Sequence, residues 1–273
     1  MFNDTLERRH FKGLTGITSL SLANNGLTAL PSDLFEDMPR LQQLLLPNNL
    51  VQPPADLFQS VLSLEVLELG KNDLSTLPVD LFRNLKKLQL LNLWKNKLSN
   101  LSPEMFKDLT SLTSLDLRHN GLTSLPADIF KYLISLKNLS LNGNNFQTLP
   151  PGLFSQNKKL ESIQFSDSRH SSLTLPNGLF SNLPNLKTVD LQNSGLKEIP
   201  EDIFWGSTGI NSISIQNNQL KELPLQLFHD SKDLEKLFLS SNQIHLISDR
   251  AFEHCKKLRV LDFAHNKLTN LSV

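Results

Sequence analysis

Hydrophobic residues recur along this chain in one pattern, L-x-x-L-x-L-x-x-N-x-L-x-x-L-P-x-x-x-F-x-x-L, which returns every 23, 24 or 26 residues. Its eleven copies begin at Ile17, Leu41, Leu64, Leu88, Leu112, Leu136, Leu160, Leu186, Ile210, Leu234 and Leu258. The alternation x-L-x-L in each copy predicts a short strand with one buried face. Because no single copy can bury its own leucines, the copies must stack, and the pattern predicts a solenoid of parallel strands.

Two further positions of the repeat predict what holds the coils together. An asparagine after the strand can serve backbone donors and acceptors of the turn, and it is present as Asn25, Asn49, Asn72, Asn96, Asn120, Asn144, Asn218, Asn242 and Asn266. Ser168 and Ser194 replace it in the other two copies. A column of aromatic rings should stack inside each coil, opposite the strand: Phe35, Phe58, Phe82, Phe106, Phe130, Phe154, Phe180, Phe204, Phe228 and Phe252, with Phe11 in register before them. Prolines in the same segment, such as Pro78, favour extended or single-turn structure over long helices.

Charge and hydropathy weigh against several classes of partner. The chain has 27 basic and 27 acidic residues, so no overall field draws it to nucleic acid, which is not an expected partner. No apolar run approaches the ~20 residues that cross a bilayer. Residues 1–9 also lack the apolar stretch of a signal peptide. A membrane is therefore expected only through a span elsewhere in a parent chain.

Residues that could carry catalysis or bind a metal are few. The single cysteine, Cys255, stands where other coils have leucine, which predicts a buried and inert thiol. The histidines show no ligand spacing. Asp167, Ser168 and His170 include the residue types of a hydrolytic triad, but they lie in one loop without a nucleophile elbow. There is no glycine-rich phosphate loop either, so we expect no cofactor, no metal and no enzymatic activity.

The segment after the leucine-proline pair carries a resemblance to a known family. Residues 77–82 (LPVDLF) and 125–130 (LPADIF) resemble extracellular leucine-rich repeats, and residues 91–98 and 201–208 are similar to insect-type Toll ectodomains. The resemblance implies an α/β leucine-rich-repeat solenoid, or horseshoe, with a parallel sheet on the concave face and 3-10 and short helical segments on the convex face. We expect residues 1–16 to form a partial leading repeat and residues 17–273 to form eleven repeats of one solenoid, an uncapped excerpt of a longer chain.

The same resemblance implies a function. The parent protein would be a single-pass cell-surface receptor of innate immunity or development, with this chain in its extracellular part. Its partner would be a protein ligand, for insect Tolls a cystine-knot cytokine of the Spätzle type, and the receptor would dimerise on it. Two alternatives stay open, which are a secreted matrix or adhesion protein and an intracellular repeat scaffold.

One group of predicted strand-face residues differs from the small and polar background. It lies on the second to fifth repeats and comprises Leu45, Val66, Glu68, Leu90, Asn92, Trp94, Asp116 and Arg118, with Lys71, Lys95 and His119 along its rim. Exposed aromatic, aliphatic and arginine side chains together are typical of binding hot spots. Single exposed apolar residues are ordinary, so the group carries the prediction rather than any one member. We expect binding to centre on Trp94 and Arg118.

Further candidates are weaker. Lys236 and Phe238 form a smaller pair on the tenth repeat, and Arg169 and His170 lie in an insertion within the seventh. N-glycosylation sequons occur at Asn3, Asn100, Asn138 and Asn270, at about the frequency expected by chance. A glycan at Asn138 would cover part of the predicted strand face.

Overall fold

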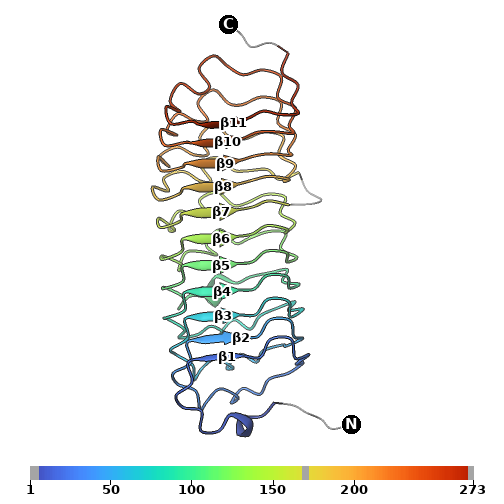
Figure 1. Ribbon diagram of the computed structural model, residues 1–273, viewed down its shortest axis with the longest axis vertical. Helices are drawn as coiled ribbons and strands as arrows, with labels where there is room; N and C mark the ends of the chain where they lie inside the picture. Colours follow the sequence, from blue (N-terminus) through green and yellow to red (C-terminus); the bar gives the residue numbers. More distant parts are fainter. Residues whose placement is uncertain (1–5, 168–171, 270–273) are drawn as a thin grey trace. The chain divides into compact units, whose positions relative to one another are not determined.

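The computed structural model describes residues 6–167 and 172–269, which form two compact units (Figure 1). Of the described residues, unit 1 comprises 6–121 and 128–136, and unit 2 comprises 122–127, 137–167 and 172–269. The strands of unit 1 are β1 (Ser19–Ser21), β2 (Gln43–Leu45), β3 (Val66–Glu68), β4 (Leu90–Asn92) and β5 (Ser114–Asp116). Those of unit 2 are β6 (Asn138–Ser140), β7 (Ser162–Gln164), β8 (Thr188–Asp190), β9 (Ser212–Ser214), β10 (Lys236–Phe238) and β11 (Val260–Asp262).

Within each unit, every strand pairs in parallel with the strand of the next coil. Val66 lies opposite Leu90, and Leu90 lies opposite Ser114, so equivalent repeat positions are neighbours. The middle residue of each strand points inward and is fully buried in most coils, as Leu67 and Leu91 are. The two flanking residues point outward and form what we call the sheet face. The predicted parallel leucine-rich-repeat solenoid is confirmed.

The side of each coil opposite the strands consists mainly of turns. Two 3-10 helices occur there, η1 (Arg8–Phe11) and η2 (Pro103–Phe106), and the described residues contain no α-helix. The predicted 3-10 segments are therefore present, and the described residues contain no longer helix, in accord with the prolines and the short 23- to 26-residue coil. No helix in the described ranges is long and apolar enough to cross a membrane.

Phenylalanine rings fill the core on this side, as predicted. Phe35 and Phe58 stack in unit 1 with centroids 6.4 Å apart, and Phe180 stacks on Phe204 in unit 2 at 6.0 Å. Members of the column from Phe35 to Phe228 are almost completely buried. Phe11 and Phe252, nearer the two ends, are only partly buried. Such aromatic pairs stabilise each coil only through its neighbour.

The asparagine ladder ties the turns together. Asn72 is fully buried, and its Nδ2 donates to the carbonyl oxygens of Leu46 and Leu69, both at 3.0 Å. Its Oδ1 accepts the N–H of Val51 at 3.3 Å. Where Ser194 replaces asparagine, its hydroxyl still donates to the carbonyl of Phe165 at 3.0 Å. The predicted role of this position is confirmed in the turns that the structure describes, and Ser168 lies outside the described residues.

Candidate protein-binding surface

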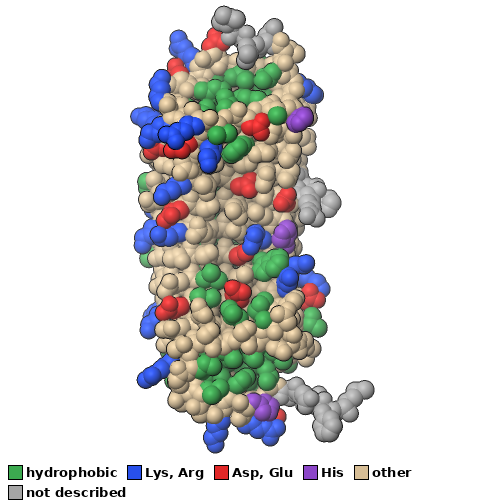
Figure 2. Space-filling view, viewed as in Figure 1, with side chains coloured by type: hydrophobic (Ala, Val, Ile, Leu, Met, Phe, Trp, Pro, Cys, Tyr) green, Lys and Arg blue, Asp and Glu red, His purple; other side chains and the backbone are tan. Residues whose placement is uncertain are grey.

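The candidate surface is formed by side chains that lie on β2–β5 of unit 1 and just after them. Its members, which we call the face cluster, are all partly exposed: Leu45, Val66, Glu68, Leu90, Asn92, Trp94, Asp116 and Arg118. Hydrophobic side chains, with acidic ones among them, gather over β3 and β4 in Figure 2. Parallel register places Val66 beside Leu90, and it places Asn92 between Glu68 and Asp116. The residues predicted from the sequence therefore lie together on one surface.

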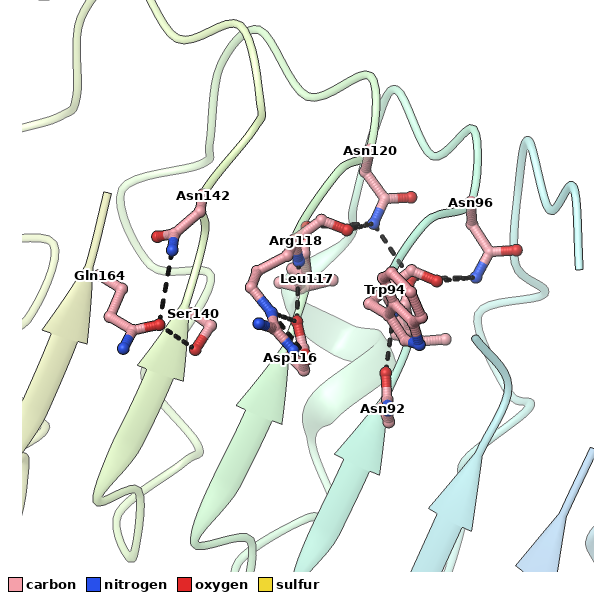
Figure 3. A network of polar contacts seen from close by, with 11 residues as sticks. Asn92, Trp94, Asn96, Asp116, Leu117, Arg118, Asn120, Ser140, Asn142 and Gln164 are labelled. Atoms are coloured by element: carbon pink, nitrogen blue, oxygen red, sulfur yellow. Dashed lines mark hydrogen bonds and ion pairs between the residues drawn. The ribbon is translucent and has the colours of Figure 1, made fainter. Parts of the chain in front are cut away.

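Trp94 is held against the preceding coil. A Cβ added at Gly70 would lie 2.6 Å from Nε1 of the indole and closer still to Cδ1, so only glycine leaves room for the ring. The Nζ of Lys71 lies 4.9 Å from the ring centroid, a cation–π contact. The backbone N–H of Trp94 donates to Oδ1 of Asn92 at 3.0 Å (Figure 3). Trp94 is thus half-buried and fixed, which reduces the entropy that it would lose on binding.

Arg118 is paired within its own coil. Its Nε lies 2.9 Å from Oδ1 of Asp116, and its Nη2 lies 2.6 Å from Oδ2 (Figure 3). The hydrogen bonds that the guanidinium donates to Asp116 raise the pKa of Arg118. The Arg118 side chain remains 42% exposed to solvent. Arg118 therefore presents a fixed, charge-compensated pair rather than a free positive charge. Asp116 is the last residue of β5 and Arg118 follows it in the turn, where the two-residue spacing lets their side chains pair.

Lys71, Lys95 and His119 occupy one repeat position on three successive coils. All three have a left-handed backbone, with φ of 55°, 53° and 52°. Other coils place Gly143 or Asn193 there, residue types that tolerate this conformation at little cost. Among the described residues, no carboxylate lies within ion-pair distance of Lys71 or Lys95. Two positive charges without a carboxylate partner therefore border the face cluster, at the rim positions predicted from the sequence.

The sheet face of unit 2 has a different character. Its outward residues are mostly serine, threonine, asparagine and glutamine, and the area over β6–β8 in Figure 2 is largely free of hydrophobic and basic side chains. Gln164 accepts a hydrogen bond from Ser140 at 3.0 Å, as Figure 3 shows. On β10, Lys236 is exposed, whereas Phe238 is partly buried. The smaller predicted pair therefore lies beside exposed Val260 of β11, which is opposite Lys236 in the sheet.

The predicted glycosylation sites and the residues of the predicted insertion lie partly within and partly outside the described residues. Asn100 and Asn138 are exposed, Asn138 on β6, and their glycosylation stays a prediction. Asn3, Asn270, Arg169 and His170 lie outside the described residues.

Reactive and metal-binding groups are sparse in the structure. Cys255 is buried, and this burial raises the pKa of its thiol to about 11, which keeps it protonated at neutral pH. Within residues 6–167 and 172–269, no group of three or more histidine, cysteine, aspartate or glutamate side chains is arranged to hold a metal ion. The face cluster and its rim are therefore the best-supported functional surface.

Comparison with known proteins identifies the repeat. A family model described as leucine rich repeat matches residues 4–51, 62–122, 110–169 and 208–268. The chain belongs to the leucine-rich repeat family. No curated protein matches this leucine-rich repeat chain.

Solved structures relate this leucine-rich repeat domain to Toll. It is similar to a chain of the Drosophila Toll–Spätzle complex, with 33% identity and a TM-score of 0.85 over 96% of this chain and 35% of that one. The glycosylated form of that complex matches with 35% identity and a TM-score of 0.87, over 93% of this chain and 34% of that one. This chain therefore spans about a third of the length of the chains it matches, and the predicted resemblance to Toll receptors is confirmed for this part.

Two more distant matches place the fold in a wider context. A chain of a TLR13–ssRNA13 complex shares 26% identity with a TM-score of 0.79, over 92% of this chain and 36% of that one. A Listeria monocytogenes internalin shares 20% identity with a TM-score of 0.75, over 94% of this chain and 70% of that one, a likeness of fold alone.

Proposed function

We propose that this chain is part of the ectodomain of a Toll-type receptor and that its face cluster binds a protein ligand. The fixed Trp94 carries the proposal, because its ring packs on the preceding coil and it follows Asn92, which lies between Glu68 and Asp116 in the sheet. Aromatic and arginine side chains near the centre of an interface supply most of the binding energy in protein complexes. A ring already held against Gly70 is suited to that role.

Similarity to the Toll–Spätzle complex supports a specific class of ligand. In that complex Toll is bound to Spätzle, and this chain covers about a third of the matched chain. We infer that the ligand is a cystine-knot cytokine of the Spätzle type and that the parent receptor dimerises on it at the cell surface. Glycosylation at the exposed Asn100 and Asn138 would accord with this location.

RNA is the competing ligand class, because the chain is also similar to TLR13 from a complex with single-stranded RNA. The lysines at 71 and 95 favour it. Against it, acidic Glu68 and Asp116 lie in the centre of the face cluster, and the net formal charge of the chain is zero. RNA binding depends on neutralising several phosphates with basic side chains. A protein ligand therefore fits the surface better.

The test compares binding of a Spätzle-type cytokine and of a single-stranded RNA to the immobilised chain by biolayer interferometry. Trp94→Ala is expected to weaken cytokine binding at least about tenfold, and Arg118→Ala severalfold, since truncating a central anchor costs more than about 1.4 kcal/mol. Leu225→Ser is the matched control, because Leu225 is 52% exposed in unit 2 and lies outside the strands. Unchanged affinity of both face variants, or binding of RNA alone, would contradict the proposal.

A further inference from the structure

A hollow lies beside the face cluster, at the turns that follow the strands of unit 1. It has a volume of about 380 Å³ and is lined by Gly26, Asn48, Asn49, Leu50, Lys71, Asp73 and Lys95, and we call it the basic hollow. Lys71 joins it to the face cluster, because the ammonium group of this residue also lies over the Trp94 ring. A ligand on the sheet face that extends past Trp94 would reach this hollow next.

The basic hollow carries uncompensated positive charge. Its one carboxylate, Asp73, is paired with Nζ of Lys97 at 3.0 Å. Lys71 and Lys95 have no such partner among the described residues, and they come from adjacent coils. Two like charges on neighbouring coils repel each other in the free protein. An anion placed between them would relieve that repulsion and make two attractive contacts.

The turn itself does not require these lysines. Lys71 and Lys95 have left-handed φ values at a repeat position that Gly143, Asn193 and Ser241 fill in other coils with the same conformation. Their positive charge, and not the backbone, therefore distinguishes the turns that line the basic hollow.

We propose that the basic hollow binds an acidic side chain of the protein ligand between Lys71 and Lys95, while an adjoining apolar residue of that ligand packs on Trp94. This inference rests on the proposed function and adds the chemistry of the recognised segment. The two lysine ammonium groups complement a negative charge, and the negatively charged group of a protein ligand is the carboxylate of an aspartate or glutamate. Leu50, which is 52% exposed at the border of the hollow, provides apolar contact for the stem of that side chain.

Trp94 itself can report occupancy of the hollow. The Lys71 ammonium contacts the indole in the free chain, and a bound carboxylate would draw it away. The chain has two tryptophans, so a Trp205→Phe background leaves Trp94 as the sole tryptophan, which is excited apart from the single tyrosine, Tyr132, at about 295 nm. A short acetylated oligoglutamate is the probe, with an oligoglutamine of equal length as the neutral control and a single-stranded RNA of similar charge as the competing class.

The decisive variant is Lys71→Asn with Lys95→Asn. Asparagine occupies this position in other coils, as Asn48 and Asn193 do, so the double variant removes charge and keeps the turn. Lys86→Asn with Lys87→Asn is the matched control, since both of these lysines are exposed in unit 1 and the net charge changes equally. We expect oligoglutamate to shift Trp94 emission, and we expect the decisive variant to weaken its binding at least about tenfold while the control does not. Raised salt should weaken binding as well.

Three results would overturn the proposal. They are no response to oligoglutamate, equal affinity of the decisive and control variants, and binding of RNA without binding of oligoglutamate. These outcomes are separable from failure of the proposed function. If the cytokine binds through Trp94 but the decisive variant binds it with unchanged affinity, the ligand uses the face cluster without the basic hollow. If oligoglutamate binds as expected and no cytokine does, the basic hollow binds carboxylates and the proposed cytokine ligand is wrong.

Discussion

Replacing Asn72 by alanine should destabilise the solenoid more than most single substitutions. The Asn72 side chain is fully buried and donates to the carbonyls of Leu46 and Leu69, while it accepts the N–H of Val51. Alanine leaves the N–H of Val51 without its partner, whereas the two carbonyls lose one donor each and keep another, from Asn49 and Asn96. An unsatisfied buried N–H costs about 1–3 kcal/mol, and each lost hydrogen bond to a carbonyl that keeps a donor costs about 0.5–1.5 kcal/mol. We therefore expect Asn72→Ala to lower the free energy of unfolding by roughly 3–5 kcal/mol.

Serine at the same position provides the matched control. In another coil the hydroxyl of Ser194 donates to the carbonyls of Phe165 and Gln192 at 3.0 and 3.1 Å, so serine fulfils part of the asparagine role. Asn72→Ser should therefore cost about half as much as Asn72→Ala. Urea unfolding followed by circular dichroism and by tryptophan fluorescence measures both, provided that the two signals change together. A loss below about 1 kcal/mol for alanine, or equal losses for the two variants, would refute the ladder as the source of this stability.

Two further predictions follow from individual contacts. Gly70→Ala should displace the Trp94 ring, cost about 1–3 kcal/mol and shift Trp94 emission to the red, whereas an unshifted spectrum would mean that the ring does not pack on Gly70. Asp190→Asn should stabilise the protein at neutral pH, because burial raises the pKa of Asp190, so its ionised form is disfavoured in the folded state. The stability that the native Asp190 contributes is present at acid pH and lost as pH rises through its raised pKa. The gain from asparagine, measured by thermal unfolding, should therefore shrink toward acid pH, and a gain independent of pH would contradict this.

The regular part of the structure was predictable because it follows from periodicity. Alternation placed the strands, as the buried Leu67 and Leu91 illustrate, and the Phe and Asn columns have the roles that burial and hydrogen bonding assign to them. These features depend only on which residues repeat at the coil spacing. The same repetition brought Val66 and Leu90 together, because parallel pairing puts equivalent positions side by side.

Contacts that depend on a side-chain rotamer were not predictable in the same way. The ring of Trp94 packs over Gly70 because that residue, one coil earlier, has no side chain. The repeat pattern describes positions within one coil and does not predict this contact between two coils. Lys71 and Lys95 likewise have no carboxylate within ion-pair distance among the described residues, which the repeat pattern does not predict. The two-residue spacing of Asp116 and Arg118 allows their ion pair, but Arg118 follows β5, so strand alternation alone does not predict it. It changes Arg118 from a free cation into a fixed hydrogen-bonding group.

The three-residue strand limits how recognition can be encoded in this protein. Each coil offers the sheet face only two strand side chains and one or two that follow, and the next contribution comes about 24 residues later in the chain. A partner that covers about 800 Å² of this chain must therefore contact several coils. The residues of its binding site are consequently far apart in the sequence. A linear peptide cut from one coil would reproduce only a fraction of the contacts. Because Asn72 and its equivalents hold the turns independently of the face, ligand preference can change one coil at a time while the backbone stays the same.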